Sequence, residues 1–346
     1  MSNVLLVIVA FGAMIFFHEL GHFLVAKRAG VRIHAFALGF GPQVFGWKRG
    51  ETTYALNVLP VGGYVRMEGE DNEGEGGPGS FRSKSVGARI AIIAAGPAMN
   101  LLLAVVILAI AASTGGVPSG TSMRVASIER GWPAAQAGLR PGDTIVAIDG
   151  ATVDSGDQVI DIIHRSAGRQ LVLTVRRGTE DLMITVTPRF DPQQGFGRIG
   201  YTAERLWTRL SPPQGLIWGI ERTGQFIAGL PTAITSLVRE GTFFKNLGGP
   251  VAAGGMLAQA AATGVQAFLH VAASLSIIIG IFNLLPIPAL DGGRLAFLIG
   301  EAVRRRPLLD ARREGLVHLV GFALLMILMF WLTARDIKPY LPLLRQ

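Results

Sequence analysis

Residues 4–25 read VLLVIVAFGAMIFFHELGHFLV, and this stretch decides what kind of protein the chain forms. The only ionisable side chains in it are those of His18, Glu19 and His22. A run of this length and apolarity is what an α-helix needs in order to cross a bilayer. Ionisable groups inside such a helix are costly to insert, so their presence indicates a functional site.

The spacing of these three residues predicts a metal site. Residues four apart share one face of a helix, so the imidazoles of His18 and His22 can bind a single Zn²⁺. Glu19, between them, can hold an attacking water and accept its proton. The alternatives are a chance match or a structural cluster satisfied by neighbouring helices, which would need polar partners for three groups inside lipid. We therefore favour the metal site.

Composition points to an integral membrane protein with room for one soluble module, since 50% of the 346 residues are hydrophobic and the mean hydropathy is +0.43. The net charge of +8 does not indicate a nucleic-acid partner. The basic residues flank the apolar runs, as is typical of the cytoplasmic loops of membrane proteins, and do not form a basic recognition face. The chain has no cysteine, which excludes disulfides and thiolate ligands. Any metal ligands must then be His, Asp or Glu.

We predict a multi-pass α-helical membrane protein with a cytoplasmic, membrane-associated β-element and one inserted extracytoplasmic PDZ-like α/β domain. About four apolar runs are long enough to span a bilayer: 4–25, 89–112, 268–285 and 316–332. The expected organisation is 1–117 for the first two helices and the β-rich loop, 118–189 for the PDZ-like domain, 190–264 for amphipathic interfacial helices, and 265–346 for the last two helices.

The soluble module is predicted from strand-like runs at 123–128, 144–148, 171–176 and 182–187 and a helical stretch at 158–166. Its centre, GWPAAQAGLRPGD at 131–143 followed by IVAIDG at 145–150, resembles the signature of bacterial PDZ domains. Such domains capture extended peptides by adding a strand to a sheet edge.

Catalytic zinc usually has three protein ligands, and depth in the membrane ranks the candidates for the third. His22 lies five residues before Lys27, near the predicted cytoplasmic boundary. His270 begins the third span on the opposite side of the membrane. If that span is helical down to Asp291, His270 lies about 30 Å from the cytoplasmic end at ~1.5 Å per residue, which excludes it. Asp291 has the required depth and lies in the segment NLLPIPALDGG at 283–293, in which two prolines interrupt the helix. The alternative to a ligand is that Asp291 caps a helix in a cytoplasmic turn. His318 is the second candidate.

The intramembrane HExxH, the NxxPxPxLDG segment and the PDZ-like module between the second and third spans together resemble the site-2 protease family, in its regulator-of-sigma-E type. Further segments share the likeness: 38–42, 60–67, 96–100 and 246–251. The chain has length for one PDZ domain, whereas the enteric members of that type carry two.

The resemblance implies an intramembrane zinc metalloprotease of the bacterial cytoplasmic (inner) membrane. It would cleave single-span membrane proteins, such as anti-sigma factors or signal-peptide remnants, after trimming by an upstream site-1-type protease. Its active site would lie near the cytoplasmic face and its PDZ-like domain outside, as a size filter. The implied roles are catalytic for Glu19, zinc-binding for His18, His22 and Asp291, and substrate-binding for Asn283 and for Gly62, Gly63, Tyr64 and Val65.

Two other classes remain open from the sequence. A membrane scaffold that binds peptides through its PDZ-like domain, with a decayed zinc site, would lack part of the ligand set. A transporter would show inverted repeats, and the four spans show none.

Overall fold

The computed structural model describes residues 2–70, 77–242 and 247–338. The chain forms two compact units: Met1–Ala112 with Ser211–Gln346, and Ser113–Leu210.

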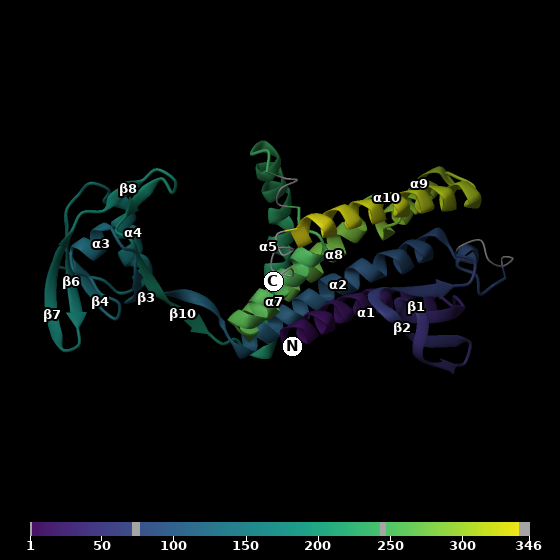
Figure 1. Ribbon diagram of the computed structural model, residues 1–346, viewed down its shortest axis with the longest axis horizontal. Helices are drawn as coiled ribbons and strands as arrows, with labels where there is room; N and C mark the ends of the chain where they lie inside the picture. Colours follow the sequence, from purple (N-terminus) through teal and green to yellow (C-terminus); the bar gives the residue numbers. More distant parts are fainter. Residues whose placement is uncertain (1, 71–76, 243–246, 339–346) are drawn as a thin grey trace. The chain divides into compact units, whose positions relative to one another are not determined.

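Four helices of the first unit are long and apolar enough to cross a membrane (Figure 1). They are α1 (Ser2–Arg28), α2 (Val86–Thr114), α8 (Val265–Leu284) and α10 (Ala311–Ile337). Each overlaps one of the four runs expected from hydropathy, so that prediction is confirmed.

Small residues let these helices approach one another closely. A Cβ added at Gly21 of α1 would lie 2.2 Å from the carbonyl oxygen of Ala95 in α2, so the two backbones are in contact there. The α2–α8 interface is a small apolar cluster centred on Ala104, Leu108, Ala273 and Ile277. The shorter α7 (Pro250–Thr263) packs on α1 and α8 through Leu257, Met14 and Leu275.

The predicted β-element is built from two long strands, β1 (Ile33–Arg49) and β2 (Thr52–Met67), each bent near its middle. The first half of β1 lies between both halves of β2, because Ala35 is opposite Thr53 on one side and Arg66 on the other. The 63–67 stretch pairs on one side only in this register, so it forms an edge of the sheet. Residues 81–83 form a 3₁₀ turn (Phe81–Ser83) before α2.

The segment after α8 leaves the helix at Leu285 and turns twice before α9 (Asp291–Arg304) begins. The two glycines after Asp291 make the turn possible. Added Cβ atoms would lie 2.1 Å from the carbonyl oxygen of Leu285 at Gly292, and 2.5 Å from that of Ile287 at Gly293. The turn therefore packs tightly against the start of α9, and Asp291 is the first residue of that helix.

Helix α5 (Pro212–Arg239) follows the strand-rich unit and starts at a capping box in which Ser211 and Gln214 bond reciprocally. Its Gly219 approaches the carbonyl oxygen of Val105 in α2, at 2.7 Å from an added Cβ. It is not among the helices with span-like hydropathy in the described residues.

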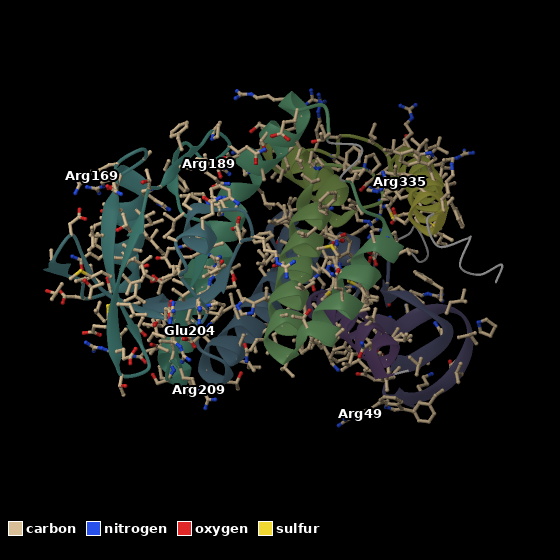
Figure 2. The ribbon with its side chains drawn as sticks, turned by 60° about the vertical axis from the view of Figure 1, so that its left-hand side comes forward. Arg49, Arg169, Arg189, Glu204, Arg209 and Arg335 are labelled. Atoms are coloured by element: carbon tan, nitrogen blue, oxygen red, sulfur yellow. The ribbon has the colours of Figure 1, made fainter. Side chains whose placement is uncertain are left out.

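The second unit is a five-strand antiparallel path in the order β10-β3-β4-β6-β7, with β5 paired to β4 and a separate β8–β9 hairpin. Its apolar core includes Ile145, Leu171, Leu173 and Val175, all fully buried. Charged side chains such as Arg169, Arg189, Glu204 and Arg209 lie on its outside (Figure 2). Its elements are β3 (Val117–Ile128), α3 (Pro133–Gln136), β4 (Thr144–Ile148), β5 (Ala151–Thr152), α4 (Gly156–Arg165), β6 (Leu171–Arg177), β7 (Glu180–Val186), β8 (Arg189–Asp191), β9 (Phe196–Arg198) and β10 (Tyr201–Thr208).

The predicted boundaries of this unit, 118–189, were too narrow. The unit continues to Leu210, because β10 pairs with β3 along its length, from Tyr201 opposite Ile128 to Thr208 opposite Val117. The expected helical region 190–264 therefore begins with three strands, and its helices start at Pro212. The reason is non-local: β10 is needed to cover the outer edge of β3, and no local pattern announces that partner.

Candidate metal centre

Three side chains from two distant parts of the chain converge on one point. The Nε2 atoms of His18 and His22 lie 3.3 Å apart, and Oδ2 of Asp291 lies 3.1 and 3.4 Å from them. Zinc bonds to nitrogen and oxygen of about 2.0–2.1 Å at tetrahedral angles place two ligand atoms about 3.3–3.4 Å apart. The triangle therefore has the size of one face of a tetrahedral zinc site.

The surroundings of the triangle also fit a cation. The side chains of His18, His22 and Asp291 are 13%, 8% and 17% exposed, and Oδ2 of Asp291 is buried without a well-formed hydrogen bond within the described structure. A buried carboxylate without partners is costly unless a positive charge compensates it. In the described part of the chain, this is the one group of three such side chains whose ligand atoms come together.

Helix α2 holds the ring of His22. The Nδ1–H of His22 donates to the carbonyl oxygen of Ile92 at 2.8 Å, which leaves the lone pair of Nε2 directed at the triangle. Space for the ring is provided by Gly96, because an added Cβ there would lie 2.2 Å from Nε2 of His22. Gly96 thus sits where any side chain would displace a ligand.

Glu19 and the predicted substrate residues line the same cavity as the triangle, which has a volume of about 310 Å³. An added Cβ at Gly63 would lie 2.9 Å from Cγ of Glu19, so the edge of the β-sheet lies against this side chain. Gly62 is the exception among the predicted residues: it does not line the cavity, and it faces the ring of Phe40. The lining residues are His18, Glu19, His22, Gly63, Tyr64, Val65, Met67, Glu70, Ile93, Asn283, Ala289, Asp291 and Arg294.

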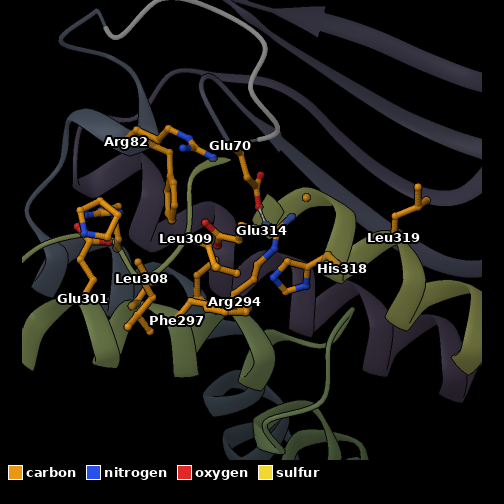
Figure 3. Close-up of a pocket in the computed structure, with 16 residues that line it drawn as sticks. Glu70, Arg82, Arg294, Phe297, Glu301, Leu308, Leu309, Glu314, His318 and Leu319 are labelled. Atoms are coloured by element: carbon orange, nitrogen blue, oxygen red, sulfur yellow. Dashed lines mark hydrogen bonds and ion pairs between the residues drawn. The ribbon is translucent and has the colours of Figure 1, made fainter. Parts of the chain in front are cut away.

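A second cavity, of about 500 Å³, adjoins the first and shares Glu70, Ile93 and Arg294 with it (Figure 3). The ion pair between Arg294 and Glu70 forms part of the wall between them. His318, the second candidate for the third ligand, lines this cavity and accepts a hydrogen bond from the backbone N–H of Ala289 through Nδ1, at 3.1 Å. It is not part of the triangle.

Sequence reasoning missed the residues of α2 that support the ligands: Ile92, Gly96 and Asn100. It also missed Glu70 and Arg294 at the wall of the cavity. The segment 96–100 was noted only for its likeness to the family. The spacing of Gly96 and Asn100, four positions apart in a helix like the two histidines, could be read from the sequence, but it does not indicate by itself that they contact the ligands.

A model of peptidase family M50 matches residues 6–328. Similar proteins include the zinc metalloprotease RasP of Geobacillus kaustophilus, 32% identical over 98% of this chain and 99% of that protein. The regulator of sigma-W protease RasP of Bacillus subtilis is 33% identical, over 97% and 98%.

Among solved structures, part of this chain is similar to the PDZ domain of an SdrC-like protein from Listeria monocytogenes. The identity is 27% and the TM-score 0.22, covering 25% of this chain and 90% of that one.

Proposed function

This chain belongs to peptidase family M50, the site-2 proteases, and is a zinc metalloprotease, and we propose that it cleaves peptide bonds in or near the membrane-spanning segments of other membrane proteins. The single observation that carries the proposal is the position of Glu19. This carboxylate lines one cavity with the triangle of His18, His22 and Asp291, on a helix apolar enough to span a bilayer.

In this proposal His18, His22 and Asp291 hold the zinc, which polarises the scissile carbonyl and activates water when it is bound. Glu19 accepts a proton from the attacking water and delivers it to the nitrogen of the leaving amine. Burial of the surrounding side chains keeps bulk water away from the reacting groups, which strengthens the electrostatic contacts between them.

The sheet edge is proposed as the substrate-binding strand. A peptide bond inside a helix has its carbonyl already hydrogen-bonded, so a spanning substrate must be extended locally before attack. Gly63, Tyr64 and Val65 lie in a strand paired on one side only and line the cavity of Glu19, which supports addition of the substrate as the next strand. Asn283 lines the same cavity and would bind the substrate backbone.

We further propose that the protein lies in the bacterial inner membrane, with the zinc site near the cytoplasmic face and the PDZ-like unit outside. The support is the distribution of Lys and Arg, which cluster after the first apolar run and before the last. Substrates would be single-span proteins, anti-sigma factors among them, already trimmed by another protease. In the outer position the PDZ-like unit would exclude untrimmed substrates by size.

The 500 Å³ cavity supports a polar route to the site. It is lined by Arg82, Arg89, Glu301 and Glu314, so water can reach the wall formed by Glu70 and Arg294. We propose that water enters along this route. The scaffold with a decayed zinc site has no support, because the three ligand candidates and Glu19 are all present in one cavity.

The test is Glu19→Gln in the full-length protein reconstituted into liposomes with a trimmed single-span substrate. Gln is nearly isosteric and Glu19 is not a ligand, so zinc content should equal that of the wild type while cleavage is lost. Mass spectrometry of the fragments would locate the cut relative to the spanning segment. Wild-type turnover in the zinc-loaded variant would refute the proposed mechanism, and a cut far outside the membrane would refute the substrate class.

A further inference from the structure

Helix α2 contacts both histidines of the HExxH motif, and it does so with matching spacing. His22 lies against Gly96, and His18 lies against Asn100, one turn further along α2. On each helix the two residues are four positions apart, so they lie on one face. The Nδ1 atom of each imidazole, which points away from the ligand triangle, contacts a different group of α2. Nδ1 of His22 contacts the backbone carbonyl oxygen of Ile92, and Nδ1 of His18 contacts the side-chain amide of Asn100.

Asn100 is fully buried, and its environment fixes where its side chain can go. The backbone carbonyl oxygen of Asn100 accepts a hydrogen bond from Oγ of Ser276 in α8 at 2.7 Å, which holds the main chain of α2 against α8 at this position, and Ser276 is itself 0% exposed. Gly280, one turn later on α8, approaches Cβ of Asn100 to 3.3 Å from an added Cβ. Because its backbone is bonded to α8 and its Cβ lies close to Gly280, the fully buried side chain of Asn100 has few positions available to it.

In the amide of Asn100, the nitrogen Nδ2 has a hydrogen-bond partner in the described structure, whereas the oxygen Oδ1 has none. Nδ2 lies 3.3 Å from Nδ1 of His18, and Oδ1 is buried with no hydrogen-bond partner within the described structure. Rotating the amide by 180° exchanges these two atoms without moving the side chain. In the rotated position Oδ1 accepts a hydrogen bond from Nδ1–H of His18.

The two orientations have opposite consequences for metal binding. If the amide donates to Nδ1, the hydrogen of a neutral imidazole must be on Nε2, and that nitrogen cannot bind a metal. If Oδ1 accepts from Nδ1–H, the lone pair of Nε2 is directed at Asp291 and His22. Metal-binding histidines almost always donate their other N–H to an oxygen in this way.

We propose that Asn100 is a positioning residue: its side-chain oxygen accepts from Nδ1–H of His18 and so fixes the tautomer and ring orientation in which Nε2 binds the zinc. This inference rests on the proposed function, because it concerns the same ligand set. It assigns to α2 the support of both imidazoles, through a backbone carbonyl for one and a side-chain amide for the other.

The test measures metal affinity in the full-length protein, in detergent, by competition with a chelator, and the absorption spectrum of the cobalt-substituted form. Asn100→Leu keeps the size of the side chain and removes the acceptor. Loss of such a partner typically lowers metal affinity by about 10–100-fold, and we expect that loss together with a changed cobalt spectrum. Asn100→Asp retains an acceptor oxygen and should restore both.

Ser274→Ala is the matched control, because Ser274 lies on α8 and its hydroxyl donates within that helix, to the backbone carbonyl oxygen of His270, in the described part of the structure. It should leave affinity and spectrum unchanged. Wild-type affinity and spectrum in Asn100→Leu would overturn the inference. Equal losses in Asn100→Leu and Asn100→Asp would also overturn it, since they would indicate packing and not an acceptor.

These outcomes are distinct from failure of the proposed function. A wild-type protein that binds zinc but does not cleave in a Glu19-dependent manner would refute the protease mechanism and leave the affinity comparison intact. The reverse result, cleavage with no effect of Asn100→Leu on metal binding, would refute only the role of Asn100.

Discussion

Replacing Gly96 with alanine adds a single methyl group to α2 and should remove the metal. The added Cβ would lie 2.2 Å from Nε2, 2.6 Å from Cε1 and 2.8 Å from Cδ2 of His22, whereas ordinary van der Waals contact begins at 3.4 Å. The shortfall between 3.4 and 2.2 Å is about 1.2 Å, so either the ring or the helix must move by that amount. In a helix, alanine is more favourable than glycine by roughly 0.5–1 kcal/mol, so helix propensity alone predicts that Gly96→Ala stabilises the protein.

A displacement of 1.2 Å is large compared with the geometry of the site. The edges of the ligand triangle are 3.1–3.4 Å, and a shift of Nε2 by a third of that length takes His22 out of a tetrahedral arrangement. Misplacement of a catalytic group by about 1 Å costs on the order of 10²-fold in rate. We therefore expect Gly96→Ala to lose zinc during purification and to lower kcat/KM by at least about 10²-fold.

Zinc content per molecule and cleavage of a trimmed substrate should be measured on the same preparation. Gly87→Ala is the matched control, because Gly87 is also in α2 and an added Cβ there meets no atom within 4 Å. Thermal unfolding of both variants separates loss of the metal from loss of the fold. If Gly96→Ala retains zinc and turnover like Gly87→Ala, then His22 is not held in the position described above.

Three other predictions follow from the two units. Asp291→Asn should weaken zinc retention markedly, while His318→Ala, a residue that lines the neighbouring cavity, should leave it unchanged; elemental analysis decides, and the opposite ranking would contradict the ligand set. In the strand-rich unit, two hydrogen bonds of 2.8 Å from Arg177 to the buried Asp143 lower the pKa of that carboxyl, so their contribution to stability is present at neutral pH and is lost as the pH falls below about 4. Asp143→Asn should then cost about 1.5–3 kcal/mol at pH 7, since the partly exposed Arg177 can still be solvated, and progressively less in acid, by calorimetry of the full-length protein; a pH-independent cost would contradict the ion-pair account. Replacing residues 115–210 with a short linker should leave cleavage of trimmed substrate intact and admit untrimmed substrate, and inactivity of a correctly inserted deletion on both forms would show that the unit is needed for the reaction itself.

The features that the sequence determined are those with a local physical cause. An apolar run long enough to cross a bilayer can be read directly, because lipid offers no partners for polar groups, and all four runs form helices. The placement of His18 and His22 on one face follows from helical periodicity alone. Glu19, next to His18 in the sequence, lines the same cavity as the two histidines. Depth along the helices, which is also a local count, excluded His270 and favoured Asp291; in the structure the carboxylate of Asp291 lies with the two imidazoles, whereas His318 is outside this group.

The tertiary structure decided which elements meet. The strand-rich unit extends to Leu210 because β10 pairs with β3, although more than 70 residues separate them in sequence. Gly62 faces Phe40 while Gly63 lies against Glu19, a difference that depends on how the bent strand runs past α1.

The support of the two histidines by α2 was likewise beyond local reading, since Gly96 and Asn100 carry no metal-binding pattern. Their role arises from the register in which α1 and α2 pack, and close approach at Gly21 and Ala95 fixes that register. Periodicity specifies which face of a helix is functional, but only the packing of one helix against another specifies what that face touches.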